Sequence, residues 1–433
     1  MVDAPDALLE ELFPDRPSAV DWGLDRMRTA LAEVGSPDRR YSSLHVGGTN
    51  GKGSVAATWE SVLGLQGRRT GLYTSPHLCS FRERIRVGGR PVGRHRLLET
   101  AERLRPLARE LGMPMFEAAT LLALVVFAQE GIDVACIEVG LGGRLDATNV
   151  IEPEVVAITN VSVDHQDFLG ATVEEIAREK AGIVKPGVPV VTAETDDRVL
   201  AVLADAAVDA GAPFVRVDPE RDVRDVRFGE CGTTFRCAVP DGSFRELRTP
   251  LPGAHQAVNA TLAVAALEML PSPPSAKSIQ AGVAAVDWPG RGQLVWLEGR
   301  RYIFDTAHNS AATDAVARTV DQGSPRRPLV AVVGILVDKD WPRMVPAIAA
   351  VADAVVLTSP PSAPSERRWR PREARAAAEG HSARVEVVEE IGGALKRAAF
   401  LAGEGTILVT GSCHTVGDAF RALDAKPFAD RHG

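Results

Sequence analysis

The feature that most constrains this chain is a short apolar strand that runs directly into a glycine-rich turn and then a helix. The stretch reads Leu44-His45-Val46-Gly47-Gly48-Thr49-Asn50-Gly51-Lys52-Gly53-Ser54, and a helical pattern begins at Val55. In this order the backbone N–H groups of the turn and the positive end of the helix face an anion, and Lys52 adds a movable positive charge. The sequence therefore predicts a phosphate-binding loop.

The spelling of this loop departs from the common nucleotide-binding pattern G-x-x-x-x-G-K-[ST]. Val46 stands where the leading glycine would be, and Gly53 separates Lys52 from Ser54. The departure disfavours an ordinary kinase or GTPase loop.

Strand-like and helix-like segments alternate from residue 42 to about residue 192. Several of the strands are continuous apolar runs, as in parallel sheets that are buried on both faces. The pattern predicts an α/β fold with a doubly wound, mostly parallel sheet. The expected strands are 43–46, 70–73, 134–139, 155–160 and 188–192, and the expected helices include 118–129 and 173–181.

The rest of the chain predicts a hairpin and a second, smaller α/β unit. Residues 214–250 alternate loosely around the turn signal Pro240-Asp241-Gly242-Ser243, which indicates an antiparallel hairpin. Helices should follow at about 256–270 and 278–286. A second alternating series has expected strands at 301–304, 329–333, 354–357, 384–388 and 406–409, with helices at 312–320 and 391–401. We expect two domains, residues 1–293 and a Rossmann-like 294–433, with the active site between them.

Composition excludes several classes of protein. The formal net charge is −8 and no dense Lys/Arg tract is present, which argues against a nucleic-acid partner. The five cysteines form no C-x-x-C pair, so a reducing cytoplasm is expected. No stretch has the length and apolarity of a membrane span, and the acidic N-terminus lacks the apolar segment of a signal peptide. We expect a cytoplasmic protein with no membrane partner.

Polar residues follow several strands at the edge where ligands bind in an open α/β sheet. They are Ser75 after the second expected strand, Glu138 in the third and His165 after the fourth. Taken alone, Ser75 fits a turn and His165 fits many roles, whereas a carboxylate in an apolar strand is costly unless it is paired. Together beside a phosphate loop they suggest Mg²⁺ held partly by nucleotide phosphates. Lys180, from composition alone, reads as a solvated helix lysine.

An ordered set of motifs resembles the folylpolyglutamate synthase and dihydrofolate synthase family, relatives of the Mur ligases. The resemblance covers nearly the whole chain in the family's order. Besides 45–54, its motifs are 73–78, 81–85, 138–149, 164–165, 179–187, 253–259, 289–291 and 305–309. It implies ATP-dependent, ADP-forming addition of L-glutamate to a folate or dihydropteroate carboxylate through an acyl phosphate. It also implies that the chain is a monomer.

The resemblance implies roles for individual residues. Ser75, Glu138 and His165 match Mg²⁺ ligands, and Lys180 matches a lysine that is carbamylated and helps to hold a second Mg²⁺. The implied ATP contacts are Thr49, Asn50, Gly51, Lys52, Gly53, Ser54, Asn259, Arg291 and Asp305. The implied substrate contacts are Asp146, Phe116 and Arg82, and His308 falls near the reacting centre with Asn309.

The chain departs from the family at two places. Thr306 and Ser310 stand where glycine and proline are frequent, and Cys413-His414-Thr415 replaces a common Leu-Tyr-Leu. Three alternatives remain: a Mur-type ligase for a cell-wall nucleotide, a P-loop kinase or GTPase switch, and a non-catalytic nucleotide-binding module. Gly53 and the second α/β unit disfavour the switch, and the retained Lys52 and Glu138 argue against a degenerate module.

Overall fold

The computed structural model describes residues 23–163, 169–229, 232–239, 242–381 and 384–428. Its larger sheet has eight strands in the order β4-β3-β2-β5-β1-β6-β7-β8. The pairs from β2 to β8 are parallel, and β3 and β4 add an antiparallel edge. The strands are β1 (Ser42–Gly47), β2 (Thr70–Tyr73), β3 (Ile85–Val87), β4 (Arg90–Pro91), β5 (Val134–Glu138), β6 (Val155–Ile158), β7 (Val190–Thr192) and β8 (Phe214–Arg216).

Helices cover both faces of this sheet, which explains why its strands are continuous apolar runs. On one face α3 (Lys52–Leu65), α10 (Ala254–Glu268) and α11 (Ala276–Ala284) form one core with the strands. On the other, α2 (Asp25–Glu33), α4 (Arg94–Glu110) and α5 (Met115–Gln129) form a second core. A third core joins α7 (Val173–Ala181) and α8 (Asp197–Asp209) to β6 and β7.

A small antiparallel sheet follows, in the order β11-β10-β9. Its strands are β9 (Val223–Gly229), β10 (Gly232–Ala238) and β11 (Phe244–Thr249), preceded by the short helix α9 (Pro219–Asp222). The expected hairpin is thus β10–β11, although residues 240–241 of its turn lie outside the described residues. The predicted antiparallel hairpin is confirmed, and two strands that were not predicted accompany it, because β9 adds a third strand and β8 joins the large sheet.

The second α/β unit has a six-stranded sheet in the order β12-β13-β17-β14-β15-β16. Only β12 is antiparallel to its neighbour. The strands are β12 (Gln293–Leu297), β13 (Arg300–Phe304), β14 (Leu329–Val333), β15 (Ala354–Leu357), β16 (Val385–Val387) and β17 (Thr406–Thr410). The helices are α12 (Ser310–Gly323), α13 (Trp341–Ala349), α14 (Arg375–Glu379), α15 (Ile391–Ala402) and α16 (Cys413–Ala422).

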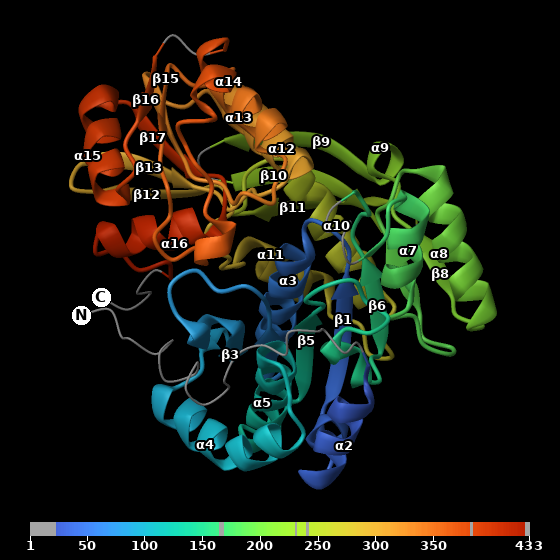
Figure 1. Ribbon diagram of the computed structural model, residues 1–433. Helices are drawn as coiled ribbons and strands as arrows, with labels where there is room; N and C mark the ends of the chain where they lie inside the picture. Colours follow the sequence, from blue (N-terminus) through green and yellow to red (C-terminus); the bar gives the residue numbers. More distant parts are fainter. Residues whose placement is uncertain (1–22, 164–168, 230–231, 240–241, 382–383, 429–433) are drawn as a thin grey trace.

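The two faces of the second sheet are packed by different helices. Residues of α12, α13 and α14 form the core on one face, and residues of α15 and α16 form the core on the other. Figure 1 shows this unit, in orange and red, stacked against the larger one, in blue and green, with the small sheet beside the junction. The predicted α/β class with two parallel-rich sheets is confirmed. Among the described residues, no helix combines the length and apolarity needed to cross a membrane.

Candidate active site

A cavity of about 410 Å³ lies between the two α/β units, at the carboxyl ends of β1, β2 and β5. The large unit contributes the glycine-rich loop, the loop after β2 and helix α10, and the second unit contributes the loop after β13 and helix α12. Predicted site residues that line it are Thr49, Asn50, Gly51, Lys52, Gly53, Ser54, Ser75, Glu138, Lys180, Asn259, Arg291, Asp305 and His308. Residues distant in the sequence therefore share one cavity.

The glycines of the loop after β1 are required by close approach. Gly48 has φ +129°, and a Cβ there would lie 1.9 Å from the Thr159 hydroxyl. Gly51 has φ +87° and precedes the first turn of α3. At Gly53 the conformation is ordinary, but a Cβ would lie 2.5 Å from the Trp288 ring. The glycine that breaks the common loop pattern thus makes room for an indole at the cavity wall.

The loop is held in part by Asn160, which follows β6. Thr49 N donates to Asn160 O at 2.7 Å, and Asn50 N donates to Asn160 Oδ1 at 3.2 Å. Asn160 Nδ2 in turn donates to Asn50 O at 3.0 Å. Asn160 was not among the predicted site residues, although its place at the end of an apolar strand was a usable signal.

Two lysine ammonium groups converge on one carbonyl of this loop. Lys52 Nζ donates to Gly48 O at 3.1 Å and to Thr49 O at 3.0 Å. Lys180 Nζ, from α7, donates to the same Gly48 O at 2.9 Å, and its side chain is buried. The interpretation of Lys180 as a solvated helix lysine was therefore wrong.

Glu138 is one of the buried carboxylates that line the cavity. Its Oε2 accepts a hydrogen bond from Ser75 N at 3.1 Å. Burial raises the pKa of Glu138, and the positive charges of Lys52 and Arg291 oppose that rise. The two oxygen-bearing side chains, Ser75 and Glu138, therefore face the same cavity from adjacent strand ends.

His165, the third predicted metal ligand, lies outside the described residues together with Asp164. Within the described ranges there is no group of three His, Cys, Asp or Glu side chains arranged to hold a metal ion. Hard oxygen donors such as Ser75 and Glu138 suit Mg²⁺, which commonly takes only one or two protein ligands beside substrate phosphates and water. The described pair fits that kind of site.

The second unit faces the cavity through Asp305. Its carboxylate accepts from Gly292 N at 2.8 Å and from Ala307 N at 2.9 Å, which fixes the junction between the units. Burial raises the pKa of Asp305 to about 6, and Arg291 opposes the rise. His255, on α10, also lines the cavity, and burial lowers its pKa to about 4, so its imidazole is neutral at pH 7.

His308 and Asn309, in the same loop as Asp305, add to the contact between the second unit and the cavity. His308 Nδ1 lies 3.1 Å from Thr306 O, so Nδ1 carries the hydrogen and Nε2 carries the lone pair in the neutral ring. Asn309 Nδ2 donates to Asn50 Oδ1 at 3.0 Å across the two units, and Asn309 Oδ1 also caps α12 by accepting from Ala312 N at 2.9 Å. The phosphate loop is thus tied directly to the second unit.

The three predicted substrate contacts do not line this cavity themselves, although Phe116 and Asp146 contact residues that do. Asp146 is buried and accepts from Leu141 N at 2.8 Å and Thr148 N at 3.0 Å, so its carboxylate organises its own loop. Phe116 packs against Gly140, where a Cβ would lie 2.2 Å from its ring. Arg82 Nε donates to Val92 O at 2.6 Å.

Comparisons with known proteins agree with this arrangement. Residues 46–267 match the Mur ligase middle domain, and residues 290–413 match the Mur ligase, glutamate ligase domain. The dihydrofolate synthase/folylpolyglutamate synthase of Mycobacterium tuberculosis is 36% identical over 81% of this chain and 76% of its own length. The protein of the same name from Escherichia coli is 33% identical over 94% of this chain and 92% of its own length.

Solved structures are similar over almost the whole chain. Mycobacterium tuberculosis folylpolyglutamate synthase complexed with ADP has a TM-score of 0.87 and 34% identity, and the match covers 98% of each chain. E. coli FolC in complex with DHPP and ADP has a TM-score of 0.84 and 30% identity, covering 98% of this chain and 99% of its own. The chain belongs to the folylpolyglutamate synthase/dihydrofolate synthase family of the Mur ligases.

Proposed function

We propose that this protein is an ATP-dependent, ADP-forming ligase that joins the amine of L-glutamate to the carboxylate of a folate or of dihydropteroate. The observation that carries the proposal is the convergence of Lys52, Glu138, Asp305 and His308, from two α/β units, on one cavity. The ADP-bound relatives of the same fold support a nucleotide in such a cavity.

The reaction has two steps that need positioning and charge neutralisation more than covalent help from the protein. The substrate carboxylate attacks the γ-phosphorus, the bond to ADP breaks and an acyl phosphate forms. The glutamate amine then attacks the carbonyl carbon, and the tetrahedral intermediate collapses to the amide with loss of phosphate and a proton. A cavity between two units suits this sequence, because closure excludes water from the acyl phosphate.

The chain's own groups fit these needs. Lys52 would move from the Gly48 and Thr49 carbonyls to the phosphate, where it offsets the charge that develops during transfer. Thr49, Asn50, Gly51, Gly53 and Ser54 would surround the phosphates, with Asn259, Arg291 and Asp305 holding the rest of the nucleotide. His308, with its lone pair on Nε2, would accept the proton that the amine loses.

We assign the Mg²⁺ site to Ser75 and Glu138, with His165 as a further ligand and a second ion nearby. When bound, the ion supplies positive charge that orients and neutralises the phosphate oxygens. Lys180 would lose one proton to become the neutral amine and then react with CO₂, forming an N–C bond and releasing a second proton, which leaves a carbamate anion. Its position beside Gly48, on the same carbonyl as Lys52, brings that anion next to the phosphate loop.

Three further assignments complete the proposal. Asp146, Phe116 and Arg82 would shape the pterin-binding region from behind the cavity wall, because Phe116 packs on Gly140 of the wall. The nucleotide-binding domain spans residues 1–293 and the glutamate-ligase domain spans 294–433. The protein would act as a monomer, and no nucleic acid takes part in the reaction.

The test supplies ATP, Mg²⁺ and L-glutamate and compares acceptors by ADP release and product mass. Dihydropteroate and reduced folates are expected to drive ADP formation, each gaining the mass of one glutamyl residue. Activity only with a cell-wall nucleotide precursor would replace this function with the Mur-type reaction. If none of the acceptors stimulated ADP release, the proposal that the protein is a ligase would be contradicted.

A further inference from the structure

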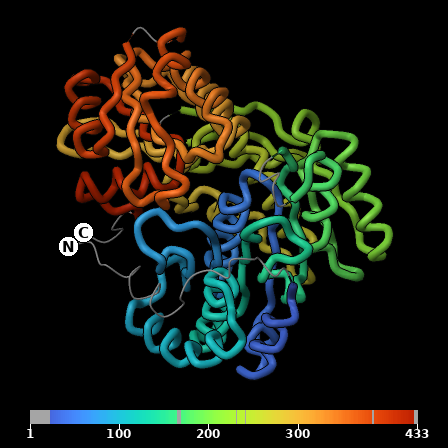
Figure 2. Tube along the Cα trace, in the orientation of Figure 1, coloured from blue at the N-terminus to red at the C-terminus, as the bar shows by residue number. Residues whose placement is uncertain are grey.

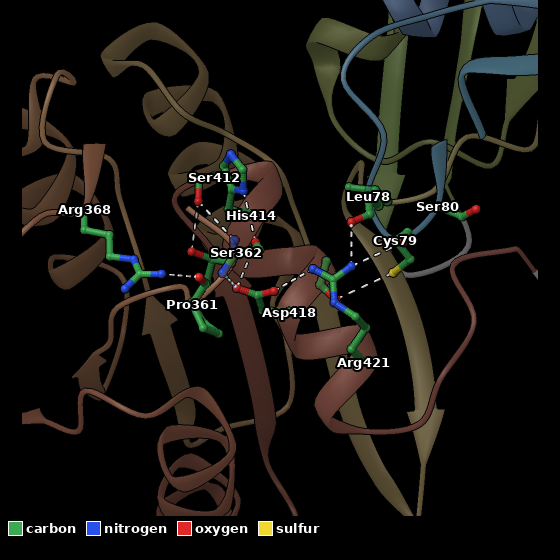
Figure 3. Close-up of polar contacts among 12 residues, drawn as sticks. Leu78, Cys79, Ser80, Pro361, Ser362, Arg368, Ser412, His414, Asp418 and Arg421 are labelled. Carbon is green, nitrogen blue, oxygen red and sulfur yellow. Dashed lines mark hydrogen bonds and ion pairs between the residues drawn. The ribbon is translucent and has the colours of Figure 1, made fainter. Parts of the chain in front are cut away.

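The two α/β units also meet at a second place, where α16 is seated on residues 78–80, the segment that follows β2. Figures 1 and 2 show α16, in red, next to the blue loop of the large unit, and Figure 3 shows the side chains involved. The approach is tight, because a Cβ at Gly417 would lie 2.1 Å from Leu78 O. Cys79 Sγ also lies 3.6 Å from Gly417 O.

From the large unit, the Glu83 carboxylate accepts hydrogen bonds from the backbone N–H groups of this segment. Its carboxylate accepts from Leu78 N at 2.8 Å, from Cys79 N at 3.0 Å and from Ser80 N at 2.7 Å. Glu83 is buried and lines the main cavity. The backbone amides of the segment are therefore committed to their own domain.

From the second unit, Arg421 donates hydrogen bonds to the backbone carbonyls of the same segment. Its Nη1 donates to Leu78 O at 3.4 Å and to Cys79 O at 3.3 Å. Its Nη2 donates to Asp418 Oδ1 at 2.6 Å, one turn earlier on α16. A single guanidinium thus joins a buried carboxylate of one unit to two backbone carbonyls of the other (Figure 3).

The other oxygen of Asp418 is fixed within the second unit. Asp418 Oδ2 accepts from Ser362 N and from Ser362 Oγ, each at 3.0 Å. Ser362 Oγ also lies 3.0 Å from His414 Nδ1. Since the hydroxyl donates to Asp418, the imidazole Nδ1–H donates to the hydroxyl, and a continuous chain runs from His414 to Arg421.

Both segments that form this contact are continuous with residues that line the main cavity. The segment 78–80 continues directly from Ser75-Pro76-His77, which lines the main cavity, and Ser75 N bonds Glu138. In the second unit, Cys413 lines the same cavity at the first residue of α16. Movement of α16 relative to residues 78–80 would therefore displace Ser75 and the opposite wall of the cavity together.

We propose that Arg421 and Asp418 form an interdomain latch that holds the second unit on residues 78–80 and so positions Ser75 and Glu138 for the reaction. Arg421 is a positioning residue, because it acts through the backbone of the segment rather than on substrate. The proposal deepens the proposed ligase function and rests on it for its kinetic readout. Its conformational readout does not depend on that function.

The test compares the wild-type protein with Arg421→Met, Arg421→Lys and Asp418→Asn. A matched control is Arg375→Met, which removes an exposed arginine that pairs with Glu379 on α14 of the same unit. Arg421→Met should lower kcat for ADP formation by about tenfold to a hundredfold, as small misplacements do, with little change in the KM for ATP. Small-angle X-ray scattering should show a larger radius of gyration than for the wild type. Arg421→Lys should recover part of both properties, and Arg375→Met should match the wild type.

Two results would overturn the latch. One is wild-type kcat and an unchanged radius of gyration in Arg421→Met. The other is a loss of activity that is proportional to the fall in melting temperature in both Arg421→Met and Asp418→Asn, while the radius of gyration stays unchanged. That result would indicate a purely structural role. If the wild-type protein formed no ADP with any acceptor, the proposed function would fail, and the scattering comparison would still decide the latch.

Discussion

Two glycine-rich loops follow neighbouring parallel strands of the large sheet, and they differ in where their polar groups point. The loop after β1, residues 47–54, lines the cavity throughout from Gly48 to Ser54. The loop after β5, residues 140–149, lines the same cavity only from Gly140 to Gly142 and turns the Asp146 carboxylate inward, where it accepts from Leu141 N and Thr148 N. We call these the open loop and the closed loop.

The closed loop supports the open one rather than duplicating it. A Cβ at Gly143 would lie 2.7 Å from Glu179 O and 2.9 Å from Lys180 O, so the loop packs against the end of α7. Asn149 Nδ2 donates to Gly182 O at 2.9 Å, just beyond the same helix. Lys180 is thereby aimed at Gly48 of the open loop. Glycine content alone does not identify a ligand-binding loop. What matters is whether the neighbouring polar groups face the cavity or bond within the protein.

The largest effect should come from comparing Lys52, within the open loop, with Lys185, which lies outside the closed loop and bonds its backbone. Lys52→Ala in the open loop is expected to lower kcat/KM for ADP formation by about 10³-fold, because the charge on the transferred phosphoryl loses its partner. Lys185→Met is the control, since Lys185 Nζ donates to Asn149 O at 2.8 Å in the closed loop and lies outside the cavity lining. Both variants should keep the wild-type circular dichroism spectrum. Normal turnover by Lys52→Ala would refute the role given to the open loop.

The glycines should differ in how much an added methyl group costs. In Gly48→Ala the new Cβ meets Thr159 both at its hydroxyl and at its backbone N, 1.9 Å and 3.0 Å away, so the variant should lose more than about 3 kcal/mol of stability. In the closed loop, Gly142→Ala meets only the end of the Leu169 side chain at 2.9 Å and should lose about 1–2 kcal/mol, mostly from its φ of +69°. Denaturant unfolding measures both. Equal losses would contradict the packing difference between the loops.

Asp146→Ala tests whether the closed loop is closed by that carboxylate. The half-buried Leu141 N–H, the buried Thr148 N–H and the Thr148 hydroxyl lose their acceptor, so the free energy of unfolding should fall by about 2 kcal/mol. ADP affinity, measured by calorimetry at a temperature where the variant is folded, should remain within a few fold of wild type. A large loss of ADP affinity with unchanged stability would mean that the Asp146 carboxylate serves a ligand.

A smaller effect should appear in the pH dependence of stability. His45, on β1, places Nε2 2.9 Å from the Thr148 hydroxyl, and burial lowers its pKa from 6.5 to about 3. The folded protein keeps this imidazole neutral while the unfolded chain binds a proton, so the stabilisation is complete above pH 6.5 and is lost as the pH falls toward 3. The loss from this group is at most about 1.4 kcal/mol per pH unit. His45→Gln should flatten the decline between pH 6 and pH 4, and an unchanged slope would refute this assignment.

The sequence predicted the parts of the fold that depend on local pattern. The apolar runs 70–73, 329–333 and 354–357 coincide with β2, β14 and β15, because buried parallel strands need no partner-specific side chain. The strands β3, β4, β9 and β12 were missed. They are short or half-polar segments at a sheet edge or, for β3, next to one, and such segments leave a weak pattern.

The sequence predicted the site residues that lie within one continuous motif. It did not predict the contacts between segments that are distant in the chain. The reason for Gly53 is Trp288, which no local pattern connects to the loop. The buried setting of Lys180 depends on the closed loop packing against α7, and the buried Asp146 carboxylate is satisfied by one backbone amide before it and one after it. The seating of α16 on residues 78–80 likewise joins segments from opposite ends of the chain.

The most direct test of the account follows one oxygen atom through the reaction. The acceptor is dihydropteroate or a reduced folate labelled with ¹⁸O in the carboxylate that gains glutamate, supplied with ATP, Mg²⁺ and L-glutamate. An acyl-phosphate route transfers one labelled oxygen to the released phosphate, which mass spectrometry detects. Phosphate free of label, with amide product still forming, would show that the carboxylate does not attack the γ-phosphate and would contradict the mechanism assigned to this cavity.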